Sequence, residues 1–140
     1  MKTLIALSGV ANQGKSTSIK IAYDMIKTAY PKAHFDEIII GVDITVVITI
    51  DGVKVGIESQ GDPGSRLFRS LDHFVKVGCK VIVCATRTRG ATVDAVSALS
   101  GKYNIIWLNK TRASSIQAQG TSNRSIAQQI FNAVKIAISA

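Results

Sequence analysis

The sequence has 140 residues, 46% of them hydrophobic, which is enough apolar mass for one domain over 1–140 with one core. The net charge of +8 favours an acidic partner, which could be a nucleotide, a nucleic acid or a phosphorylated metabolite. Two cysteines are too few for a disulfide framework, and no apolar run approaches the roughly 18 residues of a membrane span. We therefore expect a reduced, cytoplasmic protein that does not enter a membrane.

Short apolar runs alternate with segments of helical periodicity along the chain. Two β-rich runs are separated by Asp51–Gly52, a strong hairpin signal, and should pair antiparallel. Asp62 and Pro63 are suited to the N-cap and first position of a helix. Strands are expected at 3–9, 44–50, 53–58, 80–86 and 103–109, and helices at 15–30, 62–78, 92–100 and 122–138.

This element order predicts an α/β fold with helices on both faces of a mostly parallel, five-stranded sheet. The hairpin adds one antiparallel strand at an edge of that sheet. Between the last strand and the last helix, residues 110–122 predict a polar loop. In such sheets ligands bind beyond the carboxyl ends of the strands, so we expect the functional site at that edge.

The segment SGVANQGKST, residues 8–17, follows the first predicted strand and opens the first predicted helix. Gly9, Gly14, Lys15 and Ser16 match the pattern G-x-x-x-x-G-K-[ST] at every fixed position. The glycines let the backbone wrap a phosphate, Lys15 reaches the β- and γ-phosphates, and the Ser16 hydroxyl can bind Mg²⁺. The alternative is a glycine-rich turn with a surface lysine. The candidate nucleotide-binding residues of this segment are Gly9, Asn12, Gln13, Gly14, Lys15, Ser16 and Thr17.

At these residues the chain resembles the P-loop nucleoside triphosphate hydrolases and kinases. The resemblance follows the strand–helix order of the whole chain, although only the first loop matches in detail. It implies a three-layer P-loop sandwich that binds ATP and Mg²⁺.

The segment ESQG, Glu58 to Gly61, ends the second hairpin strand and resembles the D-x-x-G motif of GTPases, with Glu in place of Asp. The resemblance implies that Glu58 contacts Mg²⁺ through water and that the Gly61 N–H reaches the γ-phosphate. Gln60 and Asp62 could orient or activate an attacking water, and Asp62 could equally be a helix cap. Asp43 and Thr45 fall in no recognisable motif, and we expect a loop hydrogen bond or an exposed strand position for each.

Asn109 and Lys110 stand after the last predicted strand, as in the N-K-x-D motif that GTPases use for guanine. The fourth position is Arg112, which has only donors and cannot replace the carboxylate that reads guanine. ATP is therefore favoured over GTP.

Arg87 and Arg89 lie in a glycine-flanked turn after the strand at 80–86, with Thr92 as a candidate cap for the next helix. Either arginine could stabilise the transferred phosphoryl group, and alternatively the pair could bind a second anionic substrate. Arg66 and Arg69 are expected near the same edge of the sheet.

Three functions follow from these features. The first is a small ATPase that hydrolyses ATP to regulate or move a partner. The second is a small-molecule or nucleotide kinase, although the only insertion that could form a lid, residues 110–121, carries few arginines. The third is a nucleic-acid-binding module, which depends on charge alone and lacks interleaved aromatic and basic residues.

Overall fold

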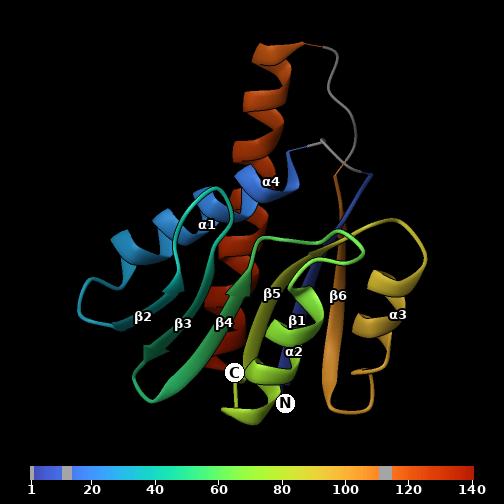
Figure 1. Cartoon of the computed structure of the whole chain (residues 1–140). Coiled ribbons are helices and arrows are strands. Elements are labelled where there is room, and N and C mark those ends of the chain that lie inside the picture. Colours follow the sequence, from blue (N-terminus) through green and yellow to red (C-terminus); the bar gives the residue numbers. More distant parts are fainter. Residues whose placement is uncertain (1, 11–13, 111–114) are drawn as a thin grey trace.

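The computed structural model describes residues 2–10, 14–110 and 115–140. Figure 1 shows that these residues form a central sheet with helices on both faces. The strands are β1 (Lys2–Ser8), β2 (His34–Ile39), β3 (Thr45–Ile50), β4 (Val53–Glu58), β5 (Val81–Thr86) and β6 (Tyr103–Asn109). The helices are α1 (Lys15–Ala29), α2 (Leu67–Lys76), α3 (Ala91–Ser97) and α4 (Ile116–Ser139).

The sheet is mixed and has six strands in the order β2-β3-β4-β5-β1-β6. The pairs β4–β5, β5–β1 and β1–β6 are parallel, whereas β2–β3 and β3–β4 are antiparallel. The α/β class and the hairpin are confirmed, but the prediction of five strands with the hairpin strand at the edge was wrong. The missed strand is β2, which occupies the edge next to β3.

The sequence of β2, HFDEII, explains why it was missed. Most of its side chains are exposed, so it lacks the buried or alternating apolar pattern that marks a strand. Its hydrogen bonds to β3 hold it in the sheet, and its register shifts between Glu37 and Ile39. Hydrogen bonding to β3, and not its own sequence pattern, therefore makes this segment a strand.

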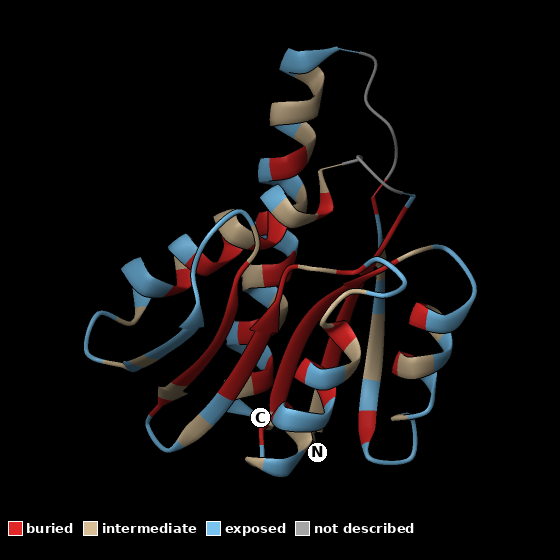
Figure 2. Ribbon diagram, in the orientation of Figure 1, coloured by how far each residue is buried: buried red, intermediate tan, exposed pale blue. Residues whose placement is uncertain are grey.

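Two apolar layers lie on opposite faces of the sheet. On one face α1 and α4 pack their apolar stripes together. The stripe of α1 contains Ile19, Ala22, Tyr23 and Ile26, whose spacing in the sequence predicts one apolar helix face. On the other face α2 covers the sheet with Leu67, Leu71 and Phe74. Phe74 fits because Gly56 of β4 lies beneath it, and a Cβ there would come within 2.5 Å of the ring. Figure 2 shows the buried residues concentrated along the central strands and the inner faces of the helices.

Two helix boundaries differ from the sequence expectation. Helix α2 begins at Leu67 with Arg66 at the N-cap, so the prediction that Asp62 caps this helix was wrong. Helix α4 begins at Ile116, where Ser115 Oγ accepts a hydrogen bond from Ala118 N (3.0 Å). Residues 116–121 therefore belong to a helix rather than to the predicted polar loop, and the first turns of α4 extend past the sheet (Figure 1).

The carboxyl ends of the four parallel strands meet at one edge of the sheet. They lead into the segments that begin at Gly9, Ser59, Arg87 and Lys110. Strand β3 runs the opposite way, so its start, and Asp43 just before it, lie at the same edge. None of the helices in the described part of the chain is long and apolar enough to cross a membrane.

Candidate functional site

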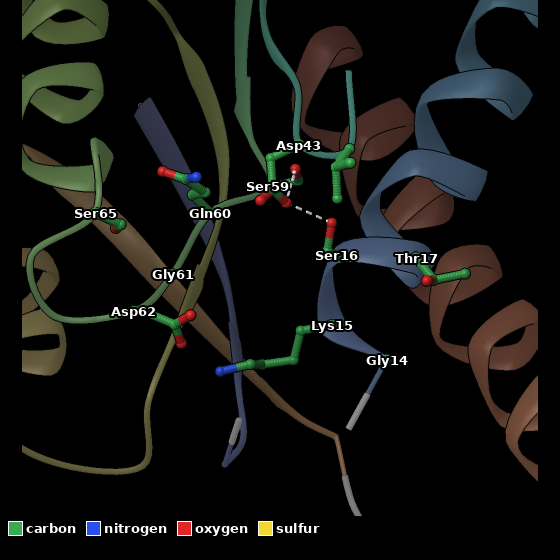
Figure 3. Close-up of a pocket in the computed structure, with 11 residues that line it drawn as sticks. Gly14, Lys15, Ser16, Thr17, Asp43, Ser59, Gln60, Gly61, Asp62 and Ser65 are labelled. Carbon is green, nitrogen blue, oxygen red and sulfur yellow. Dashed lines mark hydrogen bonds between the residues drawn. The ribbon is translucent and has the colours of Figure 1, made fainter. Parts of the chain in front are cut away.

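A cavity of about 320 Å³ lies at the carboxyl edge of the sheet, between the start of α1 and the segments that flank β3 and β4 (Figure 3). Segments far apart in the sequence meet there. Its walls are formed by Gly14, Lys15, Ser16, Thr17, Val42, Asp43, Ser59, Gln60, Gly61, Asp62 and Ser65.

Two predicted glycines are held in positions where a larger residue would not fit. Gly14 has φ of 83°, and a Cβ there would come within 2.4 Å of side-chain atoms of Gln119 and Asn123 on α4. A Cβ on Gly9 would lie 2.8 Å from the carbonyl oxygen of Lys110. Gly9 is thus packed against Lys110, which follows β6, and Gly14 against α4. The predicted residues Asn12 and Gln13 lie outside the described residues.

Lys15 is buried at the base of the cavity, with 6% of its surface exposed. Its Nζ donates to the carbonyl oxygens of Gly9 and Thr86, each at 2.6 Å. Burial lowers the pKa of Lys15, the charge of Asp62 raises it, and the charge of Arg87 lowers it further. The ammonium group therefore ties the start of the loop to the end of β5. In Figure 3 the side chain extends away from Ser16 toward the β1 ribbon.

Ser16 and Asp43 form the polar centre of the cavity. Ser16 Oγ donates to Asp43 Oδ1 at 2.6 Å, and Ser59 Oγ donates to the same oxygen at 2.8 Å (Figure 3). Ser59 Oγ in turn accepts from the backbone N–H of Ile44 (2.9 Å), which fixes the hydroxyl between the two chain segments.

The carboxyl group of Asp43 is held in its ionised form. Burial acts to raise its pKa, but the hydrogen bonds from Ser16, Ser59 and Gln60 outweigh burial and hold the pKa below its usual range. The positive charge of Arg66 acts in the same direction. A carboxylate beside a hydroxyl is a hard-oxygen donor set, which suits Mg²⁺.

Glu58, predicted to contact Mg²⁺ through water, does not line this cavity. Its side chain is completely buried, and Oε1 accepts from Thr45 Oγ1 (2.6 Å), Ser70 Oγ (2.6 Å) and Arg66 Nε (3.1 Å). Oε2 accepts from Gln60 N at 2.9 Å. These bonds join β3, β4 and the start of α2, so the arrangement gives Glu58 a structural position beside the cavity.

Asp62 lines the cavity and pairs with an arginine rather than with a helix end. Its Oδ1 accepts from Arg87 Nε at 2.9 Å, and the two side chains are 59% and 36% exposed. The backbone N–H of Arg87 donates to Thr92 Oγ1 (2.9 Å), and the N-cap of α3 is Gly90, so Thr92 is not the cap. Arg89 lies exposed in the same turn.

The remaining predicted residues fall into two groups. Gly61 and Thr17 line the cavity, and a Cβ on Gly61 would come within 2.4 Å of the Ala85 backbone. Asn109 and Lys110 are not among the lining residues. Lys110 is buried, which lowers its pKa, and its Nζ donates to Ser122 Oγ of α4 at 2.9 Å. Arg112, on which the choice of base depends, lies outside the described residues.

Four residues that line the cavity were not selected from the sequence, namely Val42, Asp43, Ser59 and Ser65. Of these, Asp43 and Ser59 take part in the polar contacts with Ser16. The hairpin could have indicated Asp43 and Ser59. Counting outward from Asp51–Gly52, the antiparallel register pairs Thr45 with Glu58, and the next residues outward are Ile44 and Ser59. Asp43 is one position further along and lies within hydrogen-bond distance of Ser59. Comparison of the chain with protein-family models, curated proteins and solved structures found no significant match.

Proposed function

We propose that this chain is a small P-loop ATPase, which binds Mg-ATP and hydrolyses it to regulate or drive a partner. The observation that carries the proposal is the arrangement of the G-x-x-x-x-G-K-S segment. It joins a buried strand to a helix, and its lysine and serine line one cavity together with a carboxylate from another segment.

The residues present fit a phosphate. Gly14 to Thr17 place the N-terminus of α1 at the cavity, where free N–H groups and the helix dipole favour an anion. Lys15 also lines the cavity and carries a positive charge, and its Nζ would have to turn from the Gly9 and Thr86 carbonyl oxygens to reach a phosphate. Adenosine triphosphate is proposed as the nucleotide because Arg112 stands where the guanine-reading carboxylate would be.

The residues also fit a magnesium ion, with one change from the sequence expectation. Ser16 and Asp43 would hold Mg²⁺, since both line the cavity and both offer oxygen. We assign Glu58 a structural role beside the cavity, because both of its carboxylate oxygens already accept hydrogen bonds from other residues. Bound Mg²⁺ would neutralise negative charge on the phosphates. Among the described residues no group of three or more His, Cys, Asp or Glu side chains could hold a metal.

The kinase alternative has less support than the sequence suggested. A kinase lid would have to come from the predicted polar loop, and residues 116–121 of that segment belong to α4. This leaves fewer residues for a lid than the sequence suggested. The nucleic-acid alternative has no support beyond the charge of +8.

Replacing Lys15 tests the proposal. Lys15→Ala should weaken ATP binding by at least about tenfold, or ~1.4 kcal/mol, because charged hydrogen bonds to phosphate are lost. Isothermal calorimetry with Mg-ATP and a phosphate-release assay measure the effect. Lys27→Ala is the matched control, since Lys27 lies on the same helix, 45% exposed and outside the cavity. Parental ATP affinity in a folded Lys15→Ala protein would refute the assignment.

A further inference from the structure

A second groove lies on the α2 face of the sheet, between α2 and the edge strands β2 and β3. It has a volume of about 270 Å³ and shares no lining residue with the cavity described above. In the described part of the chain no helix lies over β2 on this face, as Figure 1 shows, whereas Val47 of β3 packs with α2. The groove is lined by Ile38, Ile39, Thr45, Arg66, Arg69, Ser70 and His73.

One wall of the groove is basic. Arg66, Arg69 and His73 come from the start and middle of α2, and Arg69 and His73 are exposed. The described residues that line the groove include no acidic side chain. Glu58, the nearest carboxylate in the hydrogen-bond network, is completely buried and already bound to Arg66. The wall therefore has positive charge available for a ligand from outside.

One nitrogen of the Arg66 guanidinium group, Nη2, lacks a hydrogen-bond acceptor in the described part of the chain. Its Nε donates to Thr45 Oγ1 (2.7 Å) and Glu58 Oε1 (3.1 Å), while Nη2 is buried and has no hydrogen-bond partner among the described residues. A buried charged donor without an acceptor is costly, and such groups call for an explanation. The Arg66 side chain is 17% exposed, so its guanidinium group could turn toward the groove, where a bound carboxylate would supply the missing acceptor.

The opposite wall is apolar and belongs to the edge of the sheet. Ile38 and Ile39 line the groove although they are 44% and 40% exposed. Ile40 (55% exposed) follows these residues in the chain but does not line the groove, and Val42 lines the first cavity. Strand β2 is also terminal in the sheet, so one side of its backbone is free to pair.

We propose that this groove binds an extended, acidic and apolar segment of a protein partner, which pairs with β2. Its carboxylates would meet Arg66, Arg69 and His73, and its apolar side chains would cover Ile38 and Ile39. A small amphipathic anion could fill the groove but could not pair with the free side of β2, which favours the extended ligand. This binding does not require that the chain be an ATPase.

The test is a selection of binding peptides on the whole chain, using a phage-displayed library of random dodecapeptides. The selected peptides should be rich in Asp and Glu alternating with Val, Ile, Leu or Phe. Synthetic copies should lose affinity by at least about tenfold on Arg69→Glu, measured by fluorescence anisotropy. Lys76→Glu is the matched control, because it makes the same charge change on the same helix outside the groove, and it should change affinity less than about twofold.

A second variant tests the contribution of the apolar wall to peptide binding. Ile38→Ser should also weaken the selected peptides, and its exposed position leaves the fold intact, as circular dichroism would check. A selection with no binders, a consensus without acidic residues, or binding insensitive to both groove variants would overturn the proposal. Binding of decanoate in place of any peptide would assign the groove to a small amphipath instead. Self-association that Ile38→Ser abolishes, seen by sedimentation, would assign the face to a second copy.

Discussion

At the scale of single residues, the carboxylate that faces the cavity is Asp43, which forms the loop hydrogen bonds expected of it, and not Glu58. Asp43 faces the cavity beside Ser16, whereas Glu58 is buried in a network with Arg66, Thr45 and Ser70. The two carboxylates lie differently because β3 and β4 run in opposite directions. Glu58 ends its strand with its side chain turned toward α2, and Asp43 enters the same edge from the antiparallel neighbour.

Asp43→Asn should weaken Mg²⁺-dependent ATP binding by at least about tenfold, because an amide is a poorer ligand for Mg²⁺ than a carboxylate. Calorimetry with and without Mg²⁺ measures this, and Asp72→Asn, an exposed position on α2, is the control. Because hydrogen bonds keep the pKa of Asp43 low, the stability that its charge contributes is present above its unfolded pKa of about 3.9. That stability should be lost only as the pH falls through the lower folded value. Unchanged Mg²⁺ dependence in the variant would remove Asp43 from the metal site.

Glu58→Gln should destabilise the fold by about 3 kcal/mol, because it leaves the largely buried guanidinium of Arg66 without its counter-charge. Urea denaturation measures the loss. Glu37→Gln is the same substitution at a 39% exposed side chain, whose distance to Lys27 is 3.8 Å, and should cost at most about 1 kcal/mol. A Glu58→Gln protein of parental stability that had lost its Mg²⁺ dependence would instead restore the metal role that the E-x-x-G pattern implied.

At the scale of elements, the segment after β4 packs directly against β5. Gly61 lies so close to Ala85 that a Cβ would overlap its backbone. That segment carries Ser59, Gln60, Gly61 and Asp62 along the cavity wall, so its seating sets the shape of the cavity.

Gly61→Ala should therefore cost about 1–3 kcal/mol and weaken ATP binding, since backbone cannot move aside as a flexible side chain can. Gly101→Ala is the control, because nothing lies within 4 Å of a Cβ there, and it should change stability by at most about 0.5 kcal/mol. Thermal unfolding and calorimetry check both effects. If the two variants behaved alike, the close contact with Ala85 would not constrain the segment.

At the scale of the whole molecule, two loops from different strands meet in one ion pair at the mouth of the cavity. Asp62 follows β4, Arg87 follows β5, and both influence the pKa of Lys15, the first residue of α1. Arg87 therefore approaches the proposed phosphate site through Asp62, while Arg89 in the same turn is exposed.

If the protein hydrolyses ATP, Arg87→Ala should lower kcat by at least about tenfold with little change in ATP affinity, because the contact forms mainly in the transition state. Arg89→Ala, with the same charge change two residues away, should have a smaller effect. Phosphate release and calorimetric affinity on both variants provide the comparison. A slow basal rate that neither variant alters would point to the kinase alternative, in which these arginines hold an acceptor and its KM would rise.

The sequence by itself determined the features that depend on residues close together in the chain. The buried strands, the apolar faces of α1 and α2, the Asp51–Gly52 hairpin and the strand–loop–helix context of Gly9 to Ser16 all follow from short-range patterns. Lys15, Ser16, Gly61 and Asp62 were also selected from motifs, and all four line the cavity.

Only the tertiary structure decided what depends on partners distant in the chain. Strand β2 exists because β3 offers it hydrogen bonds, not because its exposed side chains form a strand pattern. The choice between Asp43 and Glu58 at the cavity depends on which face of the sheet each side chain takes, and on the Arg66 and Ser70 groups that α2 brings to Glu58. Motif spacing carries no information on that choice, because the competing hydrogen-bond donors come from other elements.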